Sequence, residues 1–430
     1  MELNSSNIKV AIIGGGLAGL AAASELSSRG INVTVFETAH QLGGRARSVH
    51  WKGLILDNGQ HILLGAYHQT LQLMKKIGLN AEESLLRQSL NLNMHHAINL
   101  KSYKSLPAPF NLLMGLLSCK GLNWSERYSA IRFLIQLKQI NFKLDEDIPL
   151  NELLKRFEQP NNLIRYLWEP LCLAALNTPI TSASSQIYLN VLKDSFNQKK
   201  TDSDLLLPRN DLSSLLAEPL ADFIRAHQGE IKLNSHVKQL EKINHDFSVN
   251  GSNFTHVILA LAPFRLAEIT ESLGEIVATD LVTKFTYEPI YTVYLQYPHD
   301  VKLPQVMIGL TQTMSQWVFD RGQLNGQKGL LAVIISAKGE HQKLTHEALA
   351  NQVIAELKTA FPNLPSPKWH KVIAEKRATF ACTANLKRPQ QKTTIQNLYL
   401  AGDYTEGNYP ATIEGAVQSG LSAAQLILQS

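Results

Sequence analysis

The amino-acid sequence predicts an α/β fold with two interleaved domains. Three observations lead to this class: the first 37 residues alternate strand and helix patterns, strand-rich and helical segments recur along the rest of the chain, and no low-complexity linker separates them. A chain of 430 residues that is 44% hydrophobic and 18% charged can also bury the core of two domains or more. Because no linker is visible, the chain is expected to cross between the domains more than once.

The first unit of the chain has the pattern of a strand, a glycine turn, a helix and a second strand. The strands are expected at 8–13 and 31–36, and the helix between them at 17–29, ending at Gly30. The long uncharged run in this unit also raises a membrane span or a signal segment as an alternative. That run has only 15 residues, fewer than the ~20 that cross a bilayer, and its β-branched first half and Ala-rich second half favour a strand followed by a helix.

A short hairpin and a long helical region follow. The hairpin is expected at 46–57, the helical pattern covers 67–196, and a strand pair interrupts it at about 90–103. Prolines divide the helical region into short helices, because a proline ring cannot continue a helix through its own position. These prolines are Pro149, Pro160, Pro170 and Pro179.

The second half of the chain is richer in strands. A helix is expected at 211–227, ending at Gly229, and a β-meander at 230–261 ends in a buried strand. Later elements are expected as strands at 288–297, 306–319, 329–336 and 398–401, and as helices at 345–361 and from Thr412.

Composition excludes several classes of function. The net charge of +5 and the pI near 8.9 are mild, and the basic residues are scattered, so we expect no nucleic-acid partner. The three cysteines are far apart in the sequence and form no C-x-x-C motif, which argues against a disulfide framework and against structural zinc. Their number and spacing indicate a reducing, cytoplasmic compartment. The histidines show no metal-ligand spacing, so no metal site is expected.

Two glycine turns near the N-terminus predict a dinucleotide site. Gly14, Gly16 and Gly19 form a G-x-G-x-x-G pattern between a strand and a helix, and Glu37 follows 23 residues after Gly14, where a carboxylate can accept the ribose hydroxyls of an adenosine. That carboxylate disfavours a 2′-phosphate, and therefore NADP. The later turn "GGRARSV" adds a guanidinium from Arg45 that can neutralise a pyrophosphate from the opposite side, which favours the longer cofactor FAD.

Several segments carry a resemblance to a known family. "GGGLAGLAAASEL", "VFE", "GGRAR" and "LYLAGDYTEGNYPATIEGAVQSG" resemble the amine-oxidase and carotenoid-desaturase superfamily of FAD enzymes. Within it, "LDNGQHILLGAYHQTLQLMKKIGL", "RATFAC" and "YPATIEGAVQSG" most resemble the hydroxysqualene dehydroxylases of hopanoid biosynthesis. Over residues 80–360 the resemblance is mainly one of length and pattern.

The resemblance implies a Rossmann-like FAD-binding domain of the glutathione-reductase and amine-oxidase type, interleaved with an α+β substrate domain. The FAD-binding domain is expected at 1–66, 205–265 and 390–430, and the substrate domain at 67–204 and 266–389.

The resemblance also implies the residues that bind FAD. The glycines of the first turn approach the pyrophosphate, Glu37 holds the ribose, Val237 meets the adenine, and the helix that starts at Thr412 and Ile413 faces N1 and the C2 carbonyl of the flavin, where its positive end stabilises the anionic reduced form. The full set is Gly14, Gly16, Gly19, Glu37, Gly44, Arg45, Gly59, Gln60, Val237, Gly402, Asp403, Thr412 and Ile413.

The implied reaction is the replacement of an allylic hydroxyl by hydride from reduced flavin, which converts hydroxysqualene to squalene. Hydroxide is a poor leaving group, so a general acid is expected, with His61 as the first candidate and Tyr409 or Asp57 as the others. His61 has the alternative role of a hydrogen-bond partner to the flavin or the backbone. Asp57 and Asn58 also suit a plain β-turn.

Three other functions stay open from sequence. A carotenoid or dehydrosqualene-type desaturase would run the flavin in the opposite direction, and an amine oxidase would want an aromatic cage to which Tyr404 and Tyr409 could belong. A prenyl-protein escort without redox chemistry is disfavoured by the intact glycine pattern. The weakly charged segment 106–119 is explained either by core packing or by an entry for a lipophilic isoprenoid at a membrane surface, where the protein would be peripheral on the cytoplasmic face.

Overall fold

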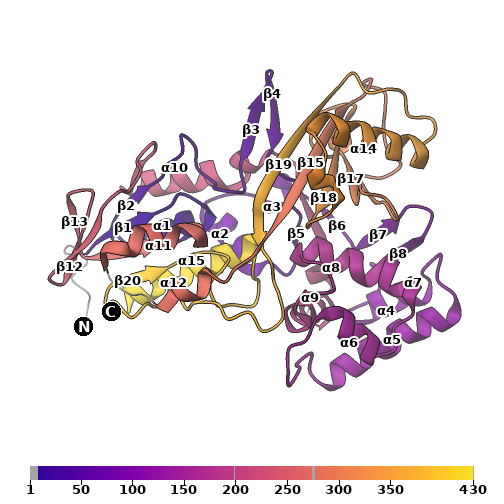
Figure 1. Ribbon diagram of the computed structural model, residues 1–430, viewed down its shortest axis with the longest axis horizontal. Coiled ribbons are helices and arrows are strands. Elements are labelled where there is room, and N and C mark those ends of the chain that lie inside the picture. The colour runs from indigo at the N-terminus through magenta and orange to yellow at the C-terminus, as the bar shows by residue number, and fades with distance from the viewer. Residues whose placement is uncertain (1–7, 198, 274–276, 430) are drawn as a thin grey trace.

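The computed structural model describes residues 8–197, 199–273 and 277–429, and its N-terminal unit builds a parallel sheet at the left of Figure 1. The strand order is β10-β2-β1-β14-β20. The strands are β1 (Lys9–Ile13), β2 (Asn32–Phe36), β10 (Glu230–Lys232), β14 (His256–Leu259) and β20 (Leu398–Leu400). β1 and β2 are buried at every position after the first, as expected for central parallel strands that are covered on both faces.

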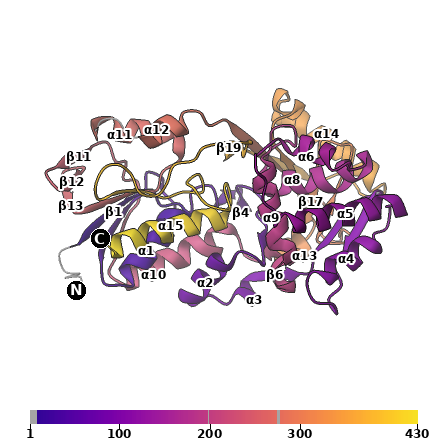
Figure 2. The ribbon, with the colours of Figure 1, turned by 90° about the horizontal axis from the view of Figure 1, so that it is seen from below.

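Helices and a small antiparallel sheet cover the two faces of the parallel sheet. Figure 2 shows α1 (Leu17–Ser27), α10 (Glu218–Ala226) and α15 (Ile413–Leu428) side by side. α1 and α15 pack closely, since a Cβ built at Gly420 would lie 2.1 Å from the carbonyl oxygen of Ala18. On the other face lie β11 (Leu240–Ile243), β12 (Asp246–Val249) and β13 (Ser252–Phe254), with the Phe254 ring 5.9 Å from that of Phe36. The predicted βαβ unit and C-terminal helix are therefore confirmed. The predicted meander is confirmed only for β11, β12 and β13, because β10 and β14 at its two ends pair in parallel within the first sheet instead.

A larger mixed sheet occupies the upper right of Figure 1. Its order is β19-β15-β18-β17-β16-β7-β8, and its neighbours pair antiparallel except for β16 and β7, which are parallel. The strands are β7 (Asn91–Met94), β8 (Ile98–Lys101), β15 (Tyr287–Gln296), β16 (Met307–Gly309), β17 (Trp317–Asp320), β18 (Leu330–Ser336) and β19 (Trp369–Phe380). Helix α14 (His346–Ala360) buries Leu349, Val353 and Leu357 in one core cluster with strand residues such as Val293 and Leu331.

A block of short helices lies at the lower right of Figure 1. It contains α4 (Phe110–Leu117), α5 (Trp124–Gln139), α6 (Leu150–Arg156), α7 (Asn161–Leu163), α8 (Glu169–Leu176) and α9 (Ser185–Asn197). Pro170 does not divide the helical region as predicted, because the π-helical turn Ile164–Trp168 joins α7 to α8 without a break. Pro149 and Pro160 do stand at helix starts as predicted, before α6 and α7. Proline has no backbone N–H. At the start of a helix this group has no partner within the helix anyway, so proline fits there.

The remaining elements include strands that the sequence analysis did not predict. β5 (Leu63–Leu64), β9 (Leu205–Pro208) and β6 (Leu85–Gln88) form a small antiparallel sheet, and the expected hairpin is β3 (Ser48–Trp51) and β4 (Leu54–Asp57). The short helices are α2 (His68–Lys76), α3 (Ala81–Ser84), α11 (Leu266–Thr270), α12 (Val277–Val282) and α13 (Arg321–Asn325). The helix expected at 211–227 opens with a π-helical turn, Ser213–Ala217, before α10.

The two large sheets draw their strands from different parts of the chain. The parallel sheet takes strands from 9–36, 230–259 and 398–400, and the mixed sheet takes strands from 91–101 and 287–380. The domain boundaries themselves stay a prediction. Within the described ranges, none of the helices has the length and apolar character needed to traverse a lipid bilayer.

Candidate functional site

A cavity of about 730 Å³ opens at the carboxyl edge of the parallel sheet. Its lining includes Gly14 after β1, Glu37 after β2, Ala260 after β14 and Asp403 after β20. Parallel α/β sheets bind their ligands at this edge, because the loops that leave the strands meet there. The cavity is therefore the candidate site.

The first glycine turn exposes backbone to the cavity. Gly14 has φ of +118°, and a Cβ there would lie 2.3 Å from the carbonyl oxygen of Ala260, so only glycine fits. A Cβ built at Gly16 meets no atom within 4 Å, and Gly16 is the N-cap of α1 without a capping side-chain bond, so the helix N-terminus is open to the cavity. Gly19 serves packing instead, since its Cβ would lie 2.0 Å from the carbonyl oxygen of Gly14.

The second glycine turn lies against the first. The Gly43 N–H donates to the Gly15 carbonyl at 2.9 Å, and a Cβ at Gly44 would lie 3.3 Å from the Cα of Gly16. Gly43 and Gly44 both have positive φ. Two backbone turns without side chains thus form one wall of the cavity, which is a suitable cradle for a diphosphate.

Glu37 is held in place in the cavity wall. Its carboxylate accepts hydrogen bonds from the backbone N–H groups of Gly15 and Ala39, each at 2.7 Å. The buried Val237 lines the cavity with it. The two residues that the sequence assigned to the adenosine therefore lie together with the glycine turn.

Arg45 and Asp403 form an ion pair in the cavity wall. Arg45 Nη2 donates to Asp403 Oδ1 at 2.6 Å, and Arg45 Nη1 donates to the carbonyl of Ala378 at 2.9 Å. Burial acts to lower the pKa of Arg45, but Asp403 and, to a smaller extent, Glu375 and Tyr287 together raise it, so the guanidinium is charged. The Arg45 side chain keeps 38% of its surface exposed and can meet an anion in the cavity.

The start of α15 forms a further part of the cavity wall. Thr412 caps this helix by accepting a hydrogen bond from the Gly415 N–H at 3.0 Å, and both Thr412 and Ile413 line the cavity. Gly402 lines it as well, at a position where a Cβ would lie 2.3 Å from the Tyr404 ring. A helix N-terminus here offers the positive end of its dipole to a ligand.

The residues fit an extended dinucleotide such as FAD. The cavity lining brings together a carboxylate suited to a ribose, two glycine turns, a guanidinium and a helix N-terminus. Among the described residues, the hydroxyls of Tyr287 and Tyr404 are buried and find no hydrogen-bond partner, and Tyr287 lines the cavity. Such a polar atom favours a ligand that completes its hydrogen bonding.

His61 is the candidate general acid that lines this cavity, together with Gly59 and Gln60. Its side chain is half-buried. Burial, and next the positive charge of Arg45, lower the pKa of His61 to about 4. The imidazole is therefore neutral at pH 7 in this state of the protein.

Tyr409 and Asp57 are directed elsewhere. The Tyr409 hydroxyl donates to Asp194 Oδ2 at 2.6 Å, and the residue lines a separate polar cavity of about 110 Å³ with Arg388 and Gln418. Asp57 accepts from Arg321 Nη1 at 2.6 Å and from the Leu212 N–H at 2.9 Å. Neither geometry presents an acid to the large cavity, so neither residue enters the proposed mechanism.

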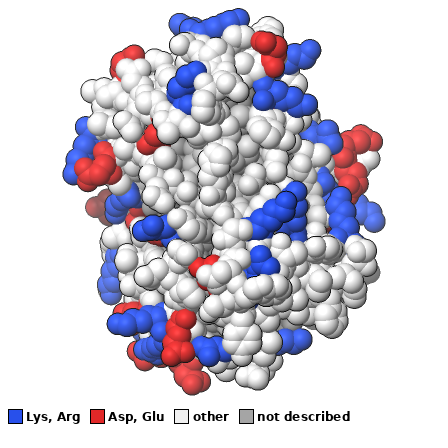
Figure 3. All heavy atoms as spheres, turned by 90° about the vertical axis from the view of Figure 1, so that its right-hand side faces the viewer, with Lys and Arg blue, Asp and Glu red and all other residues white. Residues whose placement is uncertain are grey.

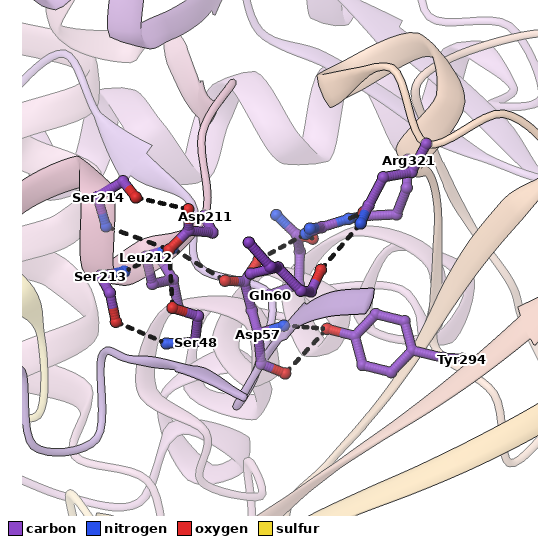
Figure 4. A network of polar contacts seen from close by, with 11 residues as sticks. Ser48, Asp57, Gln60, Asp211, Leu212, Ser213, Ser214, Tyr294 and Arg321 are labelled. Atoms are coloured by element: carbon purple, nitrogen blue, oxygen red, sulfur yellow. Dashed lines mark hydrogen bonds and ion pairs between the residues drawn. The ribbon is translucent and has the colours of Figure 1, made fainter. Parts of the chain in front are cut away.

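Figure 4 shows the network around Asp57, which sequence reasoning did not foresee. The Asp57 and Arg321 side chains are only 3% and 2% exposed, and Tyr294 exchanges two hydrogen bonds with the Asp57 backbone. Arg321 also donates to Gln60 Oε1 at 3.3 Å. Burial raises the pKa of Asp57, and the Arg321 charge opposes this rise. The expected plain β-turn is thus the buried end of β4, tied to the mixed sheet.

Other cavity residues were also missed. Glu375 accepts from Asn58 Nδ2 at 3.1 Å, and the Arg377 guanidinium lies 4.3 Å from the Phe264 ring centroid. Both Glu375 and Arg377 lie on β19, which had no predicted strand pattern. The sequence of β19, "WHKVIAEKRATF", does not alternate between apolar and polar residues, so its β-branched and aromatic residues were the available signal.

The fold and the cavity together define an FAD-dependent oxidoreductase. The chain belongs to the family of flavin containing amine oxidoreductases, whose model matches residues 17–428. A protein of Zymomonas mobilis named hydroxysqualene dehydroxylase is 28% identical over 97% of this chain and 98% of its own length. The 15-cis-phytoene desaturase of an Oncidium hybrid is 26% identical over 98% of this chain and 78% of its own.

Solved structures agree in fold. An oxidoreductase from Methanosarcina mazei matches with a TM-score of 0.75 and 18% identity, covering 97% of this chain and all of that one. The resemblance to hydroxysqualene dehydroxylases and to their superfamily is confirmed by these comparisons.

Proposed function

We propose that this oxidoreductase acts on a C30 isoprenoid and replaces the allylic hydroxyl of hydroxysqualene by hydrogen, giving squalene. The observation that carries the proposal is the match to hydroxysqualene dehydroxylases, which extends over nearly the whole length of both chains. A piecemeal match to the cofactor site alone would support only the superfamily, because the same fold carries many reactions.

The cavity residues have separate roles in this proposal. Glu37 and Val237 hold the adenosine end of FAD, and Arg45 meets the diphosphate between the glycine turns. Thr412 and Ile413 bring the start of α15 to the flavin end. Gly402 and Asp403 complete that end, with Asp403 oriented by Arg45.

The hydrocarbon is proposed to lie against the apolar part of the same cavity. Ile62, Leu176, Ile290 and Phe380 line it, and they come from segments outside the glycine turns. Apolar walls bind an isoprenoid by removing its surface from water, and they also exclude water from the reacting carbon.

The overall reaction needs one hydride and one proton for each hydroxyl that leaves as water. Reduced FAD supplies the hydride when it is bound. An allylic C–O bond breaks readily because the resulting cation is delocalised, but the oxygen must be protonated as it leaves.

His61 is proposed to serve the departing oxygen. With a pKa of about 4, the imidazole is neutral in the absence of ligands, so its N–H orients the hydroxyl by a hydrogen bond. An anionic cofactor next to Arg45 offsets the charge that helps to lower this pKa, and so favours the protonated ring that can act as the acid. Arg45 thus links cofactor binding to the state of His61.

A desaturase is the second candidate, favoured by the match to a phytoene desaturase over 98% of this chain and 78% of that protein. That reaction removes hydride from an isoprenoid and would reduce the flavin instead of oxidising it.

The test is product analysis with the holoprotein. Chemically reduced holoprotein incubated with hydroxysqualene is expected to yield squalene in the organic extract, and His61→Ala with FAD still bound is expected to yield at least about 100-fold less per unit time. Full turnover by His61→Ala would remove His61 from the mechanism. No squalene from the unaltered protein would reject the dehydroxylase proposal.

A further inference from the structure

Exposed apolar side chains gather on one part of the helical block. Of the twelve large hydrophobic side chains that are exposed in the described part of the chain, eight lie within residues 103–140. They are Tyr103, Phe110, Met114, Leu117, Trp124, Tyr128, Ile135 and Ile140. Single exposed apolar residues are ordinary, but a cluster of this kind marks an interaction surface.

The exposed residues of α4 follow the helical repeat. Phe110, Met114 and Leu117 are spaced so that they share one side of the helix, while Leu112 and Leu116 are buried on the other. Their exposed fractions are 58%, 39% and 37%. α4 therefore presents apolar side chains to the core and to solvent, and core packing accounts for only one of these faces.

α5 repeats the arrangement. Trp124, Tyr128 and Ile135 share one exposed stripe, and Phe133 and Leu137 are buried on the opposite side. Trp124 is 74% exposed and Tyr128 is 68% exposed. Tryptophan and tyrosine with one apolar face and one polar atom are the side chains that favour the interface between lipid and water.

Positive charge is concentrated in the same segment. Residues 101–143 contain seven lysines and arginines and a single acidic residue, Glu126, although the whole chain has a net charge of only +5. Glu126 is buried and belongs to the capping box of α5. Lys104, Lys120 and Lys138 are exposed. α4 and α5 lie at the right of Figure 1, the side that Figure 3 shows face-on, where wide uncharged areas are bordered by lysines and arginines together with some aspartates and glutamates.

We propose that this surface, formed by the exposed side chains of residues 103–140, docks the protein on an anionic lipid bilayer. Apolar side chains enter the headgroup region while the surrounding lysines meet the anionic headgroups. A second copy of the chain fits this surface poorly, because a symmetric contact would bring two strongly positive segments together. The proposal does not depend on which reaction the cavity performs.

Vesicle sedimentation with the holoprotein tests the proposal. The protein is expected to sediment with vesicles of phosphatidylglycerol and phosphatidylcholine, and much less with phosphatidylcholine alone or at high salt. Combining Phe110→Gln, Trp124→Gln and Tyr128→Gln is expected to lower the partition coefficient at least about tenfold. The matched control is Ile243→Gln, which alters another exposed apolar side chain, on β11, and is expected to leave binding unchanged.

Several results would overturn the proposal. The first is wild-type protein that stays in the supernatant with phosphatidylglycerol vesicles, and the second is a triple variant that binds vesicles like the wild type. The third is a wild-type protein that binds no vesicles and is dimeric in solution, while the triple variant is monomeric. Circular dichroism and the flavin absorption band check that the triple variant is folded. If it is not, the variant with Lys104→Gln, Lys120→Gln and Lys138→Gln replaces it, and an undiminished preference for phosphatidylglycerol would then reject the proposal.

Discussion

Among single residues, His61 is expected to make the stability of the protein depend on pH. Its pKa of about 4 in the folded protein is below the ordinary 6.5, so the folded state binds this proton less readily than the unfolded chain. Above pH 6.5 the ring is neutral in both the folded and the unfolded state, so it costs the folded state no stability. As the pH falls from 6.5 toward 4, the unfolded chain takes up the proton first, and the free energy of unfolding decreases.

We therefore expect the melting temperature of the apoprotein to fall between pH 6.5 and pH 4, and to fall less steeply in His61→Gln, which cannot take up the proton. Differential scanning calorimetry across this range measures both. His40→Gln is the control, at a residue outside the cavity lining. Parallel curves for wild type and His61→Gln would contradict the assigned pKa.

Arg45 is the residue through which charge is expected to control FAD affinity. Arg45→Ala would remove the proposed charge-assisted contact to the diphosphate and leave the buried Asp403 carboxylate without its guanidinium, so Kd for FAD should rise about 10- to 100-fold. Titration of apoprotein with FAD, followed by flavin fluorescence, gives this value. The exposed Arg209→Ala serves as control, and an Arg45→Ala affinity equal to that of the control would disprove the role.

Sequence reasoning at the residue scale succeeded where a motif kept its members close together. The glycine turns, Glu37 and Arg45 lie in the first 45 residues and line one cavity. Arg321 was missed because its partner Asp57 is 264 positions away, and a lone arginine carries no local pattern. For the same reason the actual environment of Asp57 could not be read from "DNGQH".

At the scale of elements, two threonine N-caps allow an effect on stability to be distinguished from an effect on cofactor binding. Thr412 caps α15 at the cavity, and Thr345 caps α14 on the mixed sheet by accepting from the Ala348 N–H. Either replacement by Ala should lower the free energy of unfolding by about 1 kcal/mol. Only Thr412→Ala should also weaken FAD binding, because only that helix start lines the cavity.

Urea unfolding and FAD titration of the two variants provide the measurement. Equal FAD affinities would show that the start of α15 does not contribute to the cofactor site.

Helices and strands could be predicted from the sequence where burial gives them a clear apolar pattern. β1, β2 and α15 are buried on wide faces, and their apolar runs were recognisable. β19 is mostly half-buried and carries lysine, arginine and glutamate, so its strand pattern is weak. β9 was missed because its four residues, Leu205–Pro208, are apolar throughout and end in proline.

At the scale of the whole molecule, the Asp57–Arg321 ion pair joins the β3–β4 hairpin to the mixed sheet through α13. Removing one partner leaves a buried charge uncompensated, so Arg321→Met should destabilise the protein by about 3–5 kcal/mol. Combining it with Asp57→Leu should recover much of this loss, because neither partner of the pair then leaves an uncompensated charge.

Urea unfolding of the single and double variants measures the coupling. Glu340→Gln is the control, since its ion pair with Lys343 is 77% and 73% exposed and should contribute less than about 1 kcal/mol. Additive effects of Asp57→Leu and Arg321→Met would refute an interaction across this contact.

The direction of hydride transfer decides the central claim, and an anaerobic single turnover in both directions measures it. Photoreduced holoprotein mixed with hydroxysqualene is expected to show return of the oxidised flavin absorption band together with one equivalent of squalene, while oxidised holoprotein mixed with phytoene is expected to stay oxidised. A flavin that remains reduced with hydroxysqualene and becomes reduced with phytoene would contradict the dehydroxylase assignment and establish a desaturase.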